Sequence, residues 1–266
     1  MTRIGVFCAL LVLVLSACTS GPPELPYPAY VQVDELDNVF IASLPGTRAK
    51  QLGGDSMTRR TSNRIDLPRD WHGTSGGSPG RSLEIFVVAG KMTIADIELG
   101  SGGYAFLPAG SLGFNLRSTD GARILYFLND VDPESVIRSP IIIDAEVLDW
   151  QASVTPGVFT KELRRDPGNG AMTWMLKVLP GASIPWQKSS AVREGYLVEG
   201  SYRHSECVAG EVHTGEYLPG GYFNRPANTI NGGPEAAAVS ESIWLLREIQ
   251  GGIEEAVPAC VELPTS

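Results

Sequence analysis

The chain has 266 residues, of which 43% are hydrophobic and 19% are charged, enough for one large globular unit or two smaller ones in tandem. A net charge of −9 argues against a nucleic-acid-binding protein and against an electrostatic membrane patch, because both need clustered Lys and Arg. No apolar run reaches the roughly 18–20 residues of a membrane-spanning helix, which excludes a polytopic membrane protein. The 30 glycines and 19 prolines lie between short β-branched and aromatic runs and favour an all-β fold.

The N-terminus carries the signals of export. Arg3 precedes an apolar run from Ile4 to Leu15, and Leu15-Ser16-Ala17-Cys18 resembles the lipobox of bacterial lipoproteins. The resemblance implies that residues 1–17 are a signal peptide and that Cys18 receives the lipid. Thr19, rather than Asp, follows this cysteine, which indicates a periplasm-facing protein at the outer membrane. An ordinary secretory signal or a short membrane anchor is the alternative.

The segment after Cys18 is rich in proline. Pro22, Pro23, Pro26 and Pro28 predict an extended tether that spaces the folded part from the lipid. Residues 31–44 are mixed apolar and acidic and can supply an edge strand. The polar, Gly-rich residues 47–63 are expected to interrupt the strands.

Two stretches of the chain repeat the same pattern of strands. In the first, residues 83–90 and 91–99 predict a tight hairpin, followed by strands in 103–110 and 122–128. In the second, strands are expected in 172–181, around 196–200 and in 242–249. Glu84 and Glu194 are 110 residues apart, as are Gly90 and Gly200, so the chain contains an internal duplication. The second copy has about eight extra residues within 203–217.

The second copy resembles the cupin superfamily. The segment Pro185-Trp186-Gln187-Lys188-Ser189-(x4)-Glu194-Gly195-Tyr196-Leu197-Val198-Glu199-Gly200 is similar to the first cupin motif, and Pro226-Ala227-Asn228-Thr229-Ile230-Asn231 is similar to the second. The chain looks like a bicupin related to the cupin half of the ChrR anti-sigma factors, with a weaker likeness to ureidoglycine aminohydrolase. This implies one jelly-roll barrel per copy. The expected organisation is signal peptide 1–17, lipidated Cys18 and tether 18–45, first repeat 46–135, second repeat 136–250 and C-terminal tail 251–266.

The resemblance also defines what the chain lacks. Cupins of this type hold a metal with three histidines and a glutamate, and here Gln187, Ser189 and Asn231 stand at the histidine positions while Glu194 matches the glutamate. Neutral amides and hydroxyls are poor ligands for Fe, Mn, Ni or Zn, so no metal and no other cofactor is expected. A Ca²⁺ site, or a metal held through His204 or His213, remains the alternative.

The same positions predict a polar site at the mouth of the second barrel. Such mouths bind small molecules with a few fixed polar groups among apolar walls. A carboxylate beside amides suits a small polar ligand, either neutral or cationic, such as a sugar, an amide or an amine. The expected polar groups are Gln187, Ser189, Glu194, Asn231 and Arg225, and the expected walls are Trp174, Trp186, Tyr196, Tyr222 and Trp244.

Three functions remain open from the sequence. The leading one is a lipid-anchored cell-envelope protein that binds a small polar molecule or serves as an interaction module. The second is a hydrolase, lyase or isomerase with Glu194 as acid/base; no other catalytic residue is assigned, and neither a nucleophile elbow nor a P-loop occurs. The third is a scaffold whose aromatic residues are ordinary core. The chain can also form a homodimer, as bicupins often pair further.

Two cysteines remain after export. Cys207 and Cys260 would lie in a compartment where disulfides persist. We expect them to pair and to attach the C-terminal tail to the second repeat. Two free, partly buried thiols are the alternative.

Overall fold

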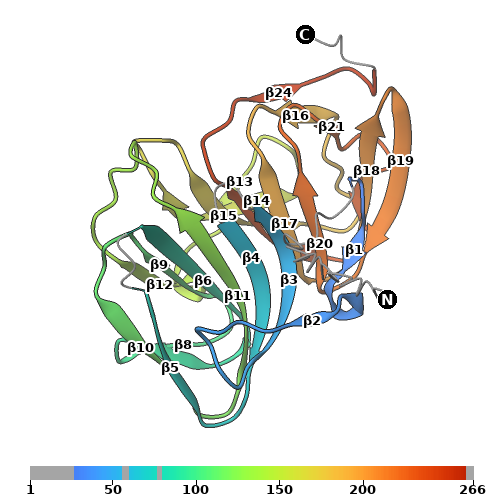
Figure 1. The fold of residues 1–266 in the computed structure, drawn as a ribbon. Coiled ribbons are helices and arrows are strands. Elements are labelled where there is room, and N and C mark those ends of the chain that lie inside the picture. The colour runs from blue at the N-terminus through green and yellow to red at the C-terminus, as the bar shows by residue number, and fades with distance from the viewer. Residues whose placement is uncertain (1–26, 56–59, 77–79, 262–266) are drawn as a thin grey trace, which may run out of the picture.

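The chain folds into two tandem jelly-roll barrels, each built from two antiparallel sheets (Figure 1). The computed structural model describes residues 27–55, 60–76 and 80–261. The signal peptide, Cys18 and the tether up to residue 26 therefore lie outside the described residues. Within these ranges, no helix has the length and apolar character needed to cross a bilayer.

The first barrel consists of a seven-stranded and a four-stranded sheet. Their strand orders are β12-β9-β6-β11-β4-β3-β2 and β5-β10-β7-β8. The strands of this repeat are β2 (Asn38–Val39), β3 (Arg48–Asp55), β4 (Arg60–Leu67), β5 (Trp71–Gly76), β6 (Arg81–Gly90), β7 (Met92–Ile94), β8 (Ile97–Leu99), β9 (Gly103–Leu107), β10 (Gly113–Ser118) and β11 (Ala122–Asp130).

The second barrel consists of a seven-stranded and a six-stranded sheet. Their orders are β1-β20-β17-β23-β15-β14-β13 and β19-β18-β21-β16-β24, with β22 on β18. The strands of this repeat are β13 (Gln151–Ala152), β14 (Val158–Arg165), β15 (Met172–Val178), β16 (Gln187–Ser189), β17 (Arg193–Glu199), β18 (Tyr202–Val208), β19 (Glu211–Tyr217), β20 (Gly221–Arg225), β21 (Ile230–Asn231), β22 (Ala237–Ala238), β23 (Ser242–Glu248) and β24 (Glu254–Ala256).

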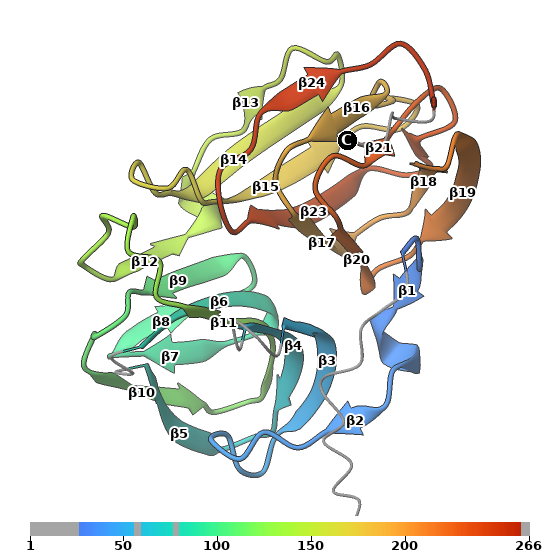
Figure 2. The ribbon, with the colours of Figure 1, turned by 45° about the horizontal axis from the view of Figure 1, so that its top comes forward.

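Each repeat lends its leading strand to the other repeat. The strand β1 (Val31–Gln32), which precedes the first repeat, pairs with β20 of the second, and β12 (Ile141–Asp144) pairs with β9 of the first (Figure 2). A short 3-10 turn follows each exchanged strand, η1 (Val33–Glu35) and η2 (Ala145–Val147). The exchange ties the two barrels together through backbone hydrogen bonds on both sides of their junction.

The hairpin expected from residues 83–99 does not form. The strand β6 pairs with β9 and β11, whereas β7 lies in the other sheet and pairs with β8 and β10. Gly90 has a φ of +77°, and a Cβ there would meet Gly121 O at 2.4 Å. Gly200 repeats this with a φ of +81° and Glu241 O at 2.0 Å. Both glycines are required because the chain changes sheets against a neighbouring backbone.

Two other expectations about local structure are corrected. Residues 47–63, expected to interrupt the strands, contain β3 and the start of β4, which pair with each other. The extra residues of 203–217 are not a loop but a longer hairpin of β18 and β19. The equivalent hairpin of the first repeat, β7 and β8, has three residues per strand instead of seven.

Three apolar cores stabilise this arrangement. One fills the first barrel, around Ile65, Leu83, Ile85 and Ile124. Another fills part of the second barrel, around Trp174, Leu197, Phe223 and Trp244. The third lies between the two large sheets and joins Phe86, Tyr104 and Leu125 of the first repeat to Met175, Tyr196, Tyr222 and Leu245 of the second.

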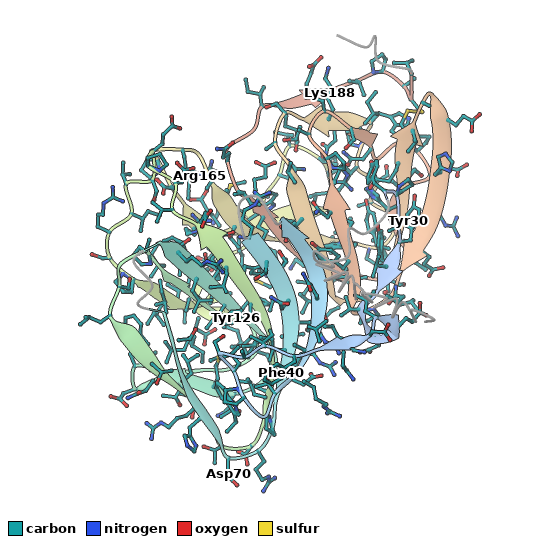
Figure 3. The ribbon with its side chains drawn as sticks, in the orientation of Figure 1. Tyr30, Phe40, Asp70, Tyr126, Arg165 and Lys188 are labelled. Carbon is teal, nitrogen blue, oxygen red and sulfur yellow. A yellow bond between two sulfur atoms is a disulfide. The ribbon has the colours of Figure 1, made fainter. Side chains whose placement is uncertain are left out.

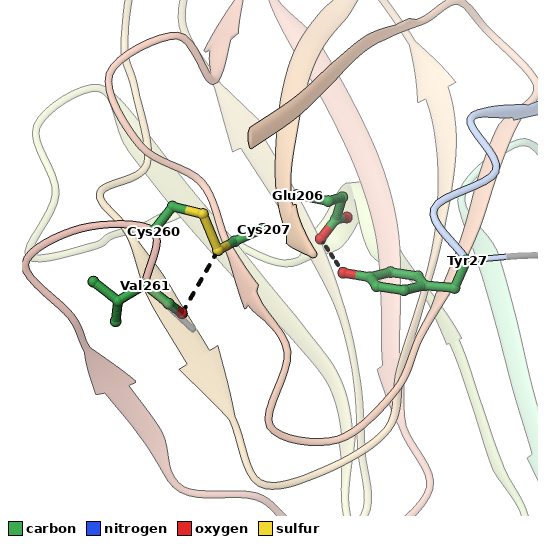
Figure 4. The surroundings of a disulfide bond; sticks show 5 residues. All are labelled: Tyr27, Glu206, Cys207, Cys260 and Val261. Atoms are coloured by element: carbon green, nitrogen blue, oxygen red, sulfur yellow. Dashed lines mark hydrogen bonds between the residues drawn. A yellow bond between two sulfur atoms is a disulfide. The ribbon is translucent and has the colours of Figure 1, made fainter. Parts of the chain in front are cut away.

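The C-terminal tail is attached to the second barrel. Its strand β24 pairs with β16, and a disulfide joins Cys207 on β18 to Cys260 with an S–S distance of 2.02 Å (Figure 4). Cys207 Sγ also lies 3.9 Å from the carbonyl oxygen of Val261. The tail therefore extends the sheet that carries Gln187.

Candidate functional site

The interiors of the two barrels differ in chemistry. The first is filled by a mainly aliphatic core, in which the hydroxyls of Ser75 and Tyr126 form a hydrogen bond of 2.6 Å (Figure 3 labels Tyr126). The second keeps a cavity of about 50 Å³. A cavity needs only about 10–15 Å³ of such space to hold one water, so this one has room for several waters or a ligand of a few heavy atoms.

Four of the eight predicted site residues line this cavity. They are Gln187, Arg225, Asn231 and Trp244. Gln187 and Asn231 face each other as partners in the pairing of β16 with β21, and the Asn231 amide donates to the Gln187 carbonyl at 3.3 Å. The cupin-like spacing therefore brings two amides together at the cavity wall.

The other four predicted residues lie elsewhere. Ser189 is buried beside the cavity, where its hydroxyl donates to Glu248 at 3.1 Å. Trp174 points into the barrel but lies beneath the Arg193 guanidinium, 5.3 Å from its centre. Glu194 and Tyr196 point away from the barrel, into the core between the two repeats. Of the further walls considered, Tyr222 also belongs to that core, and Trp186 does not line the cavity.

Glu194 is thus not part of a barrel site. Its carboxylate accepts a hydrogen bond from Ser62 of the first repeat at 2.7 Å and pairs with Arg247 at 3.4 Å. Side chains alternate between the two faces of a strand, so a shift of one residue moves a side chain to the opposite face. Arg193, the preceding residue on β17, takes the inward position instead.

The matching glutamate of the first repeat is placed in the same way. Glu84 accepts from Thr173 of the second repeat at 3.0 Å and pairs with Arg247 at 3.3 Å and Arg164 at 2.5 Å. Burial alone would raise the pKa of Glu84, but these two arginines hold the pKa below its usual value. The duplicated glutamates therefore join the repeats rather than serve two barrel interiors.

The inward arginines are paired with carboxylates. Arg193 donates to Glu248 at 2.7 Å and to Glu254 of the C-terminal strand at 2.9 Å. Arg225 donates to Glu206 at 2.7 Å and lies 2.7 Å from His204 Nε2. The cavity wall therefore carries two guanidinium groups, and each is paired with a carboxylate.

The cluster around Glu206 fixes the state of His204. Burial would raise the pKa of Glu206, but Arg225 and His204 hold that pKa far below its usual value, so the residue is an anion. Burial lowers the pKa of His204, and Arg225 lowers it further against the opposing effect of Glu206. His204 Nε2 lies 2.7 Å from Arg225 and 3.2 Å from Glu206 Oε1, so the imidazole contacts both partners of this ion pair. Tyr27 also donates to Glu206, at 2.6 Å (Figure 4).

The fold suggests a divalent metal, but the residues of the second barrel do not fit one. Arg193 and Arg225 place positive charge on the cavity, and His204 Nε2 is engaged by Arg225 and Glu206. Glu206 and Glu248 are engaged by these arginines. His213, the other candidate ligand, is exposed on β19. Within residues 27–55, 60–76 and 80–261, no three His, Cys, Asp or Glu side chains gather in a metal-binding arrangement.

The cavity instead presents hydrogen-bond donors. The Tyr202 hydroxyl is buried and has no hydrogen-bond partner. The Gln187 side-chain amide and the guanidinium groups of Arg193 and Arg225 border the same cavity. Phe223, Trp244 and Leu246 supply apolar walls. Buried polar groups are nearly always satisfied, so a phenol without a partner among the described residues, beside an amide and two guanidinium groups, marks a site that can bind a ligand.

Sequence reasoning missed Arg193, Tyr202 and Glu248. The inward position of Arg193 could have been predicted from Leu197. This apolar residue lies four positions further along the same strand, and residues an even number of positions apart share a face. Tyr202 follows Gly200 closely, but no sequence signal shows that its hydroxyl lacks a partner. Glu248 lies in the last predicted strand, two residues after Leu246, and the same alternation places both side chains inward.

Solved structures with this fold are numerous, and those compared here are cupin-fold proteins. A protein from Nostoc punctiforme PCC 73102, provisionally described as a dioxygenase, is 18% identical, with 89% of this chain and 86% of that chain covered and a TM-score of 0.68. Protein Ylba from E. coli is 17% identical, with 82% and 89% covered and a TM-score of 0.65. A variant of Bacillus subtilis oxalate decarboxylase is 12% identical, with 85% and 78% covered and a TM-score of 0.62.

These likenesses concern the fold, which is that of the cupins. No curated protein matches the sequence. The family model described as "Domain of unknown function (DUF4437)" matches residues 31–251, which include the exchanged strands and both barrels except for the last strand, β24. The chain therefore belongs to the DUF4437 family, whose members are defined by this domain and not by a known activity.

Proposed function

We propose that this chain is a lipid-anchored bicupin of the cell envelope whose second barrel binds a small molecule through carboxylate or carbonyl oxygens, without a divalent metal. The observation that carries the proposal is the cavity of about 50 Å³, bordered by two guanidinium groups, two amides and the Tyr202 hydroxyl, which has no partner among the described residues.

The ligand class follows from the charges and the donors. Arg193 and Arg225 are balanced by Glu248 and Glu206, so the cavity wall is neutral overall. Their guanidinium groups offer N–H donors and no acceptor, and donors of this kind are matched by acceptor oxygens. The expectation of a neutral or cationic ligand rested in part on the carboxylate of Glu194, which faces the other repeat. The apolar walls suit a short carbon chain attached to the acceptor group.

The catalytic alternative is not favoured. An acid/base group must lie within hydrogen-bond reach of the substrate. Glu194 does not line the cavity, and its carboxylate is held by Ser62 and Arg247.

The lipid anchor is supported by the sequence of the export signal and by the position of the tether's end. Tyr27, nine residues after Cys18, donates to Glu206 of the second barrel, and Tyr30 donates to the His213 carbonyl at 2.5 Å. A tether of nine residues spans at most about 30 Å. Mature protein with a lipid on Cys18 would therefore hold the second barrel close to the membrane surface, and mass spectrometry of its N-terminal peptide tests the modification.

Binding is tested by tryptophan fluorescence, because Trp244 lines the cavity. Purified mature protein is titrated with acetate, pyruvate and acetamide, alongside ethylamine as the cationic control. We expect acetate, pyruvate or acetamide to change the emission with saturation, and ethylamine to leave it unchanged.

Two variants locate the signal. Asn231→Leu replaces a cavity amide and should weaken binding about tenfold or more, an energy of about 1.4 kcal/mol. Ser75→Ala in the first barrel is the matched control and should bind as the wild type does. A response to ethylamine alone, or equal binding by Asn231→Leu and wild type, would contradict the proposal.

A further inference from the structure

A second and larger cavity lies between the two repeats. It has a volume of about 250 Å³ and is bordered by β6, β9 and β11 of the first repeat, β14 and β23 of the second, and the connection that follows β11. The two cavities share no lining residue, although the strand β23 borders both of them. It is therefore independent of the site proposed above.

The deep wall of this cavity is a buried ionic network. Arg164 and Arg247 both pair with Glu84, and Arg247 also donates to the Asn129 side chain at 2.9 Å. The faces of the two guanidinium groups cover Phe106 and Phe127, at 4.5 Å and 4.1 Å from the ring centres. Burying such charges is unfavourable compared with apolar residues of the same volume. A buried ionic network that borders an open cavity is a candidate functional site.

The outer wall is held in place by other carboxylates. Asp166 accepts from the Ser135 hydroxyl at 2.5 Å and from the Val136 amide at 3.1 Å, and Asp132 accepts from the Asn169 amide at 2.8 Å. These bonds attach the connection between the repeats to a turn of the second barrel. The cavity is thus formed before any ligand binds, as is usual for small-molecule sites.

The lining selects a neutral ligand with several hydroxyl groups. Asn129, Arg138 and Arg164 offer N–H donors, while Asp132 and Asp166 offer acceptor oxygens. Four carboxylates against three arginines in the lining disfavour an anion. A hydroxyl group both donates and accepts, and the apolar side chains Val131, Pro133 and Ile249 suit the C–H faces of a ring.

From this geometry we infer that the junction of the two repeats binds a neutral polyhydroxylated molecule of monosaccharide size. At about 250 Å³ the cavity is somewhat smaller than the about 300 Å³ at which small-molecule sites usually begin, so the space suits a single ring and not an oligosaccharide. The inference does not depend on the proposed function of the second barrel.

Calorimetric titration of the mature protein with glucose, galactose and N-acetylglucosamine tests this inference, with glucuronate and glucosamine as charged comparisons. We expect at least one neutral sugar to bind more tightly than both charged sugars. Absence of binding by every neutral sugar, or binding of the charged sugars alone, overturns the inference.

Variants then place the site. Ala109→Trp fills the cavity from the loop after β9 without touching the ionic network, and Ser82→Leu adds bulk on another wall should the first variant fold poorly. Each should weaken sugar binding about tenfold or more. Leu112→Trp, at a residue that is 85% exposed and outside the lining, should bind as the wild type does. Unchanged binding in both cavity variants, or loss of sugar binding in Asn231→Leu of the second barrel, overturns the inference.

Discussion

The two barrels share one architecture and differ in what fills them. In the first, the buried core is mainly aliphatic, and the hydroxyls of Ser75 and Tyr126 bond to each other. In the second, the inward positions of β17, β18 and β20 carry Arg193, His204 and Arg225. One copy of the duplicated fold is therefore built as a packed core and the other as a polar site.

The comparison also shows what the copies have in common. Their equivalent glutamates, Glu84 and Glu194, both leave the barrel interior and accept a hydroxyl from the opposite repeat, Thr173 and Ser62 respectively. The two glutamates that the sequence comparison matched to the cupin motif thus serve the junction of the repeats. Of the inward polar groups of the second barrel, Gln187 and Asn231 stand at positions matched to the motif histidines, whereas Arg193 and Arg225 place cations there.

The largest expected effect concerns the buried charges of the second barrel. Arg225→Met removes the cation that neutralises Glu206, whose side chain is 1% exposed. An unpaired buried carboxylate costs about 3–5 kcal/mol, and urea denaturation at pH 7 measures it. Arg165→Met is the control, because Arg165 and Glu162 are both half exposed (Figure 3) and such a pair contributes about 0–1 kcal/mol. Equal destabilisation by the two variants would contradict the account.

The disulfide belongs to the second barrel, where it joins β18 to the C-terminal tail. Cys207 and Cys260 are 53 residues apart, and closing a loop of this length stabilises the folded state by about 2–4 kcal/mol. Reduction should lower the free energy of unfolding of the wild type by this amount and leave a Cys207→Ser, Cys260→Ser double variant unchanged. An equal response of both proteins to reductant would show that the bond is not formed.

The dependence of stability on pH should report the ionisation of Glu206. Because the folded-state pKa of Glu206 lies below its ordinary value of 4.5, its charge stabilises the fold above that pH. This contribution is lost as the pH falls from 4.5 toward the lower folded-state pKa. The stability difference between wild type and Glu206→Gln should therefore be largest near pH 7 and shrink below about pH 4.5. A difference that widens toward acid would show that Glu206 is protonated in the folded protein.

The smallest effect compares two buried tyrosines. Tyr126→Phe in the first barrel breaks the hydrogen bond to Ser75 and should cost about 1 kcal/mol. Tyr202→Phe in the second barrel removes a hydroxyl that has no partner, and should change stability by less than about 0.5 kcal/mol while weakening ligand binding. Thermal and chemical denaturation of both variants, with the acetate titration, decides this. A clear loss of stability in Tyr202→Phe would mean that its hydroxyl is satisfied within the protein.

The sequence predicts the fold class and the duplication, and four of the site residues that it proposes line the cavity of the second barrel. Periodic apolar runs and the 110-residue spacing are local signals, and they place Gln187, Asn231, Arg225 and Trp244 near one another. The strands β3 and β4 were missed because their polar side chains serve the junction of the repeats, as Ser62 does toward Glu194. The sequence assigns Glu194 to the wrong face of its strand. A motif can still be matched when its spacing differs by one residue, but a shift of one residue along a strand moves the side chain to the opposite face. The inter-repeat cavity has no sequence signal, since its walls come from distant segments.

The central claim is that arginines, and not a divalent ion, occupy the interior of the second barrel. Metal analysis of mature protein purified without chelators and without added metal tests it most directly. The account predicts far less than one equivalent of Mn, Fe, Ni and Zn per chain, with acetate, pyruvate or acetamide still binding to that protein. One tightly held equivalent of any of these metals, lost in an Asn231→Leu variant, would contradict it.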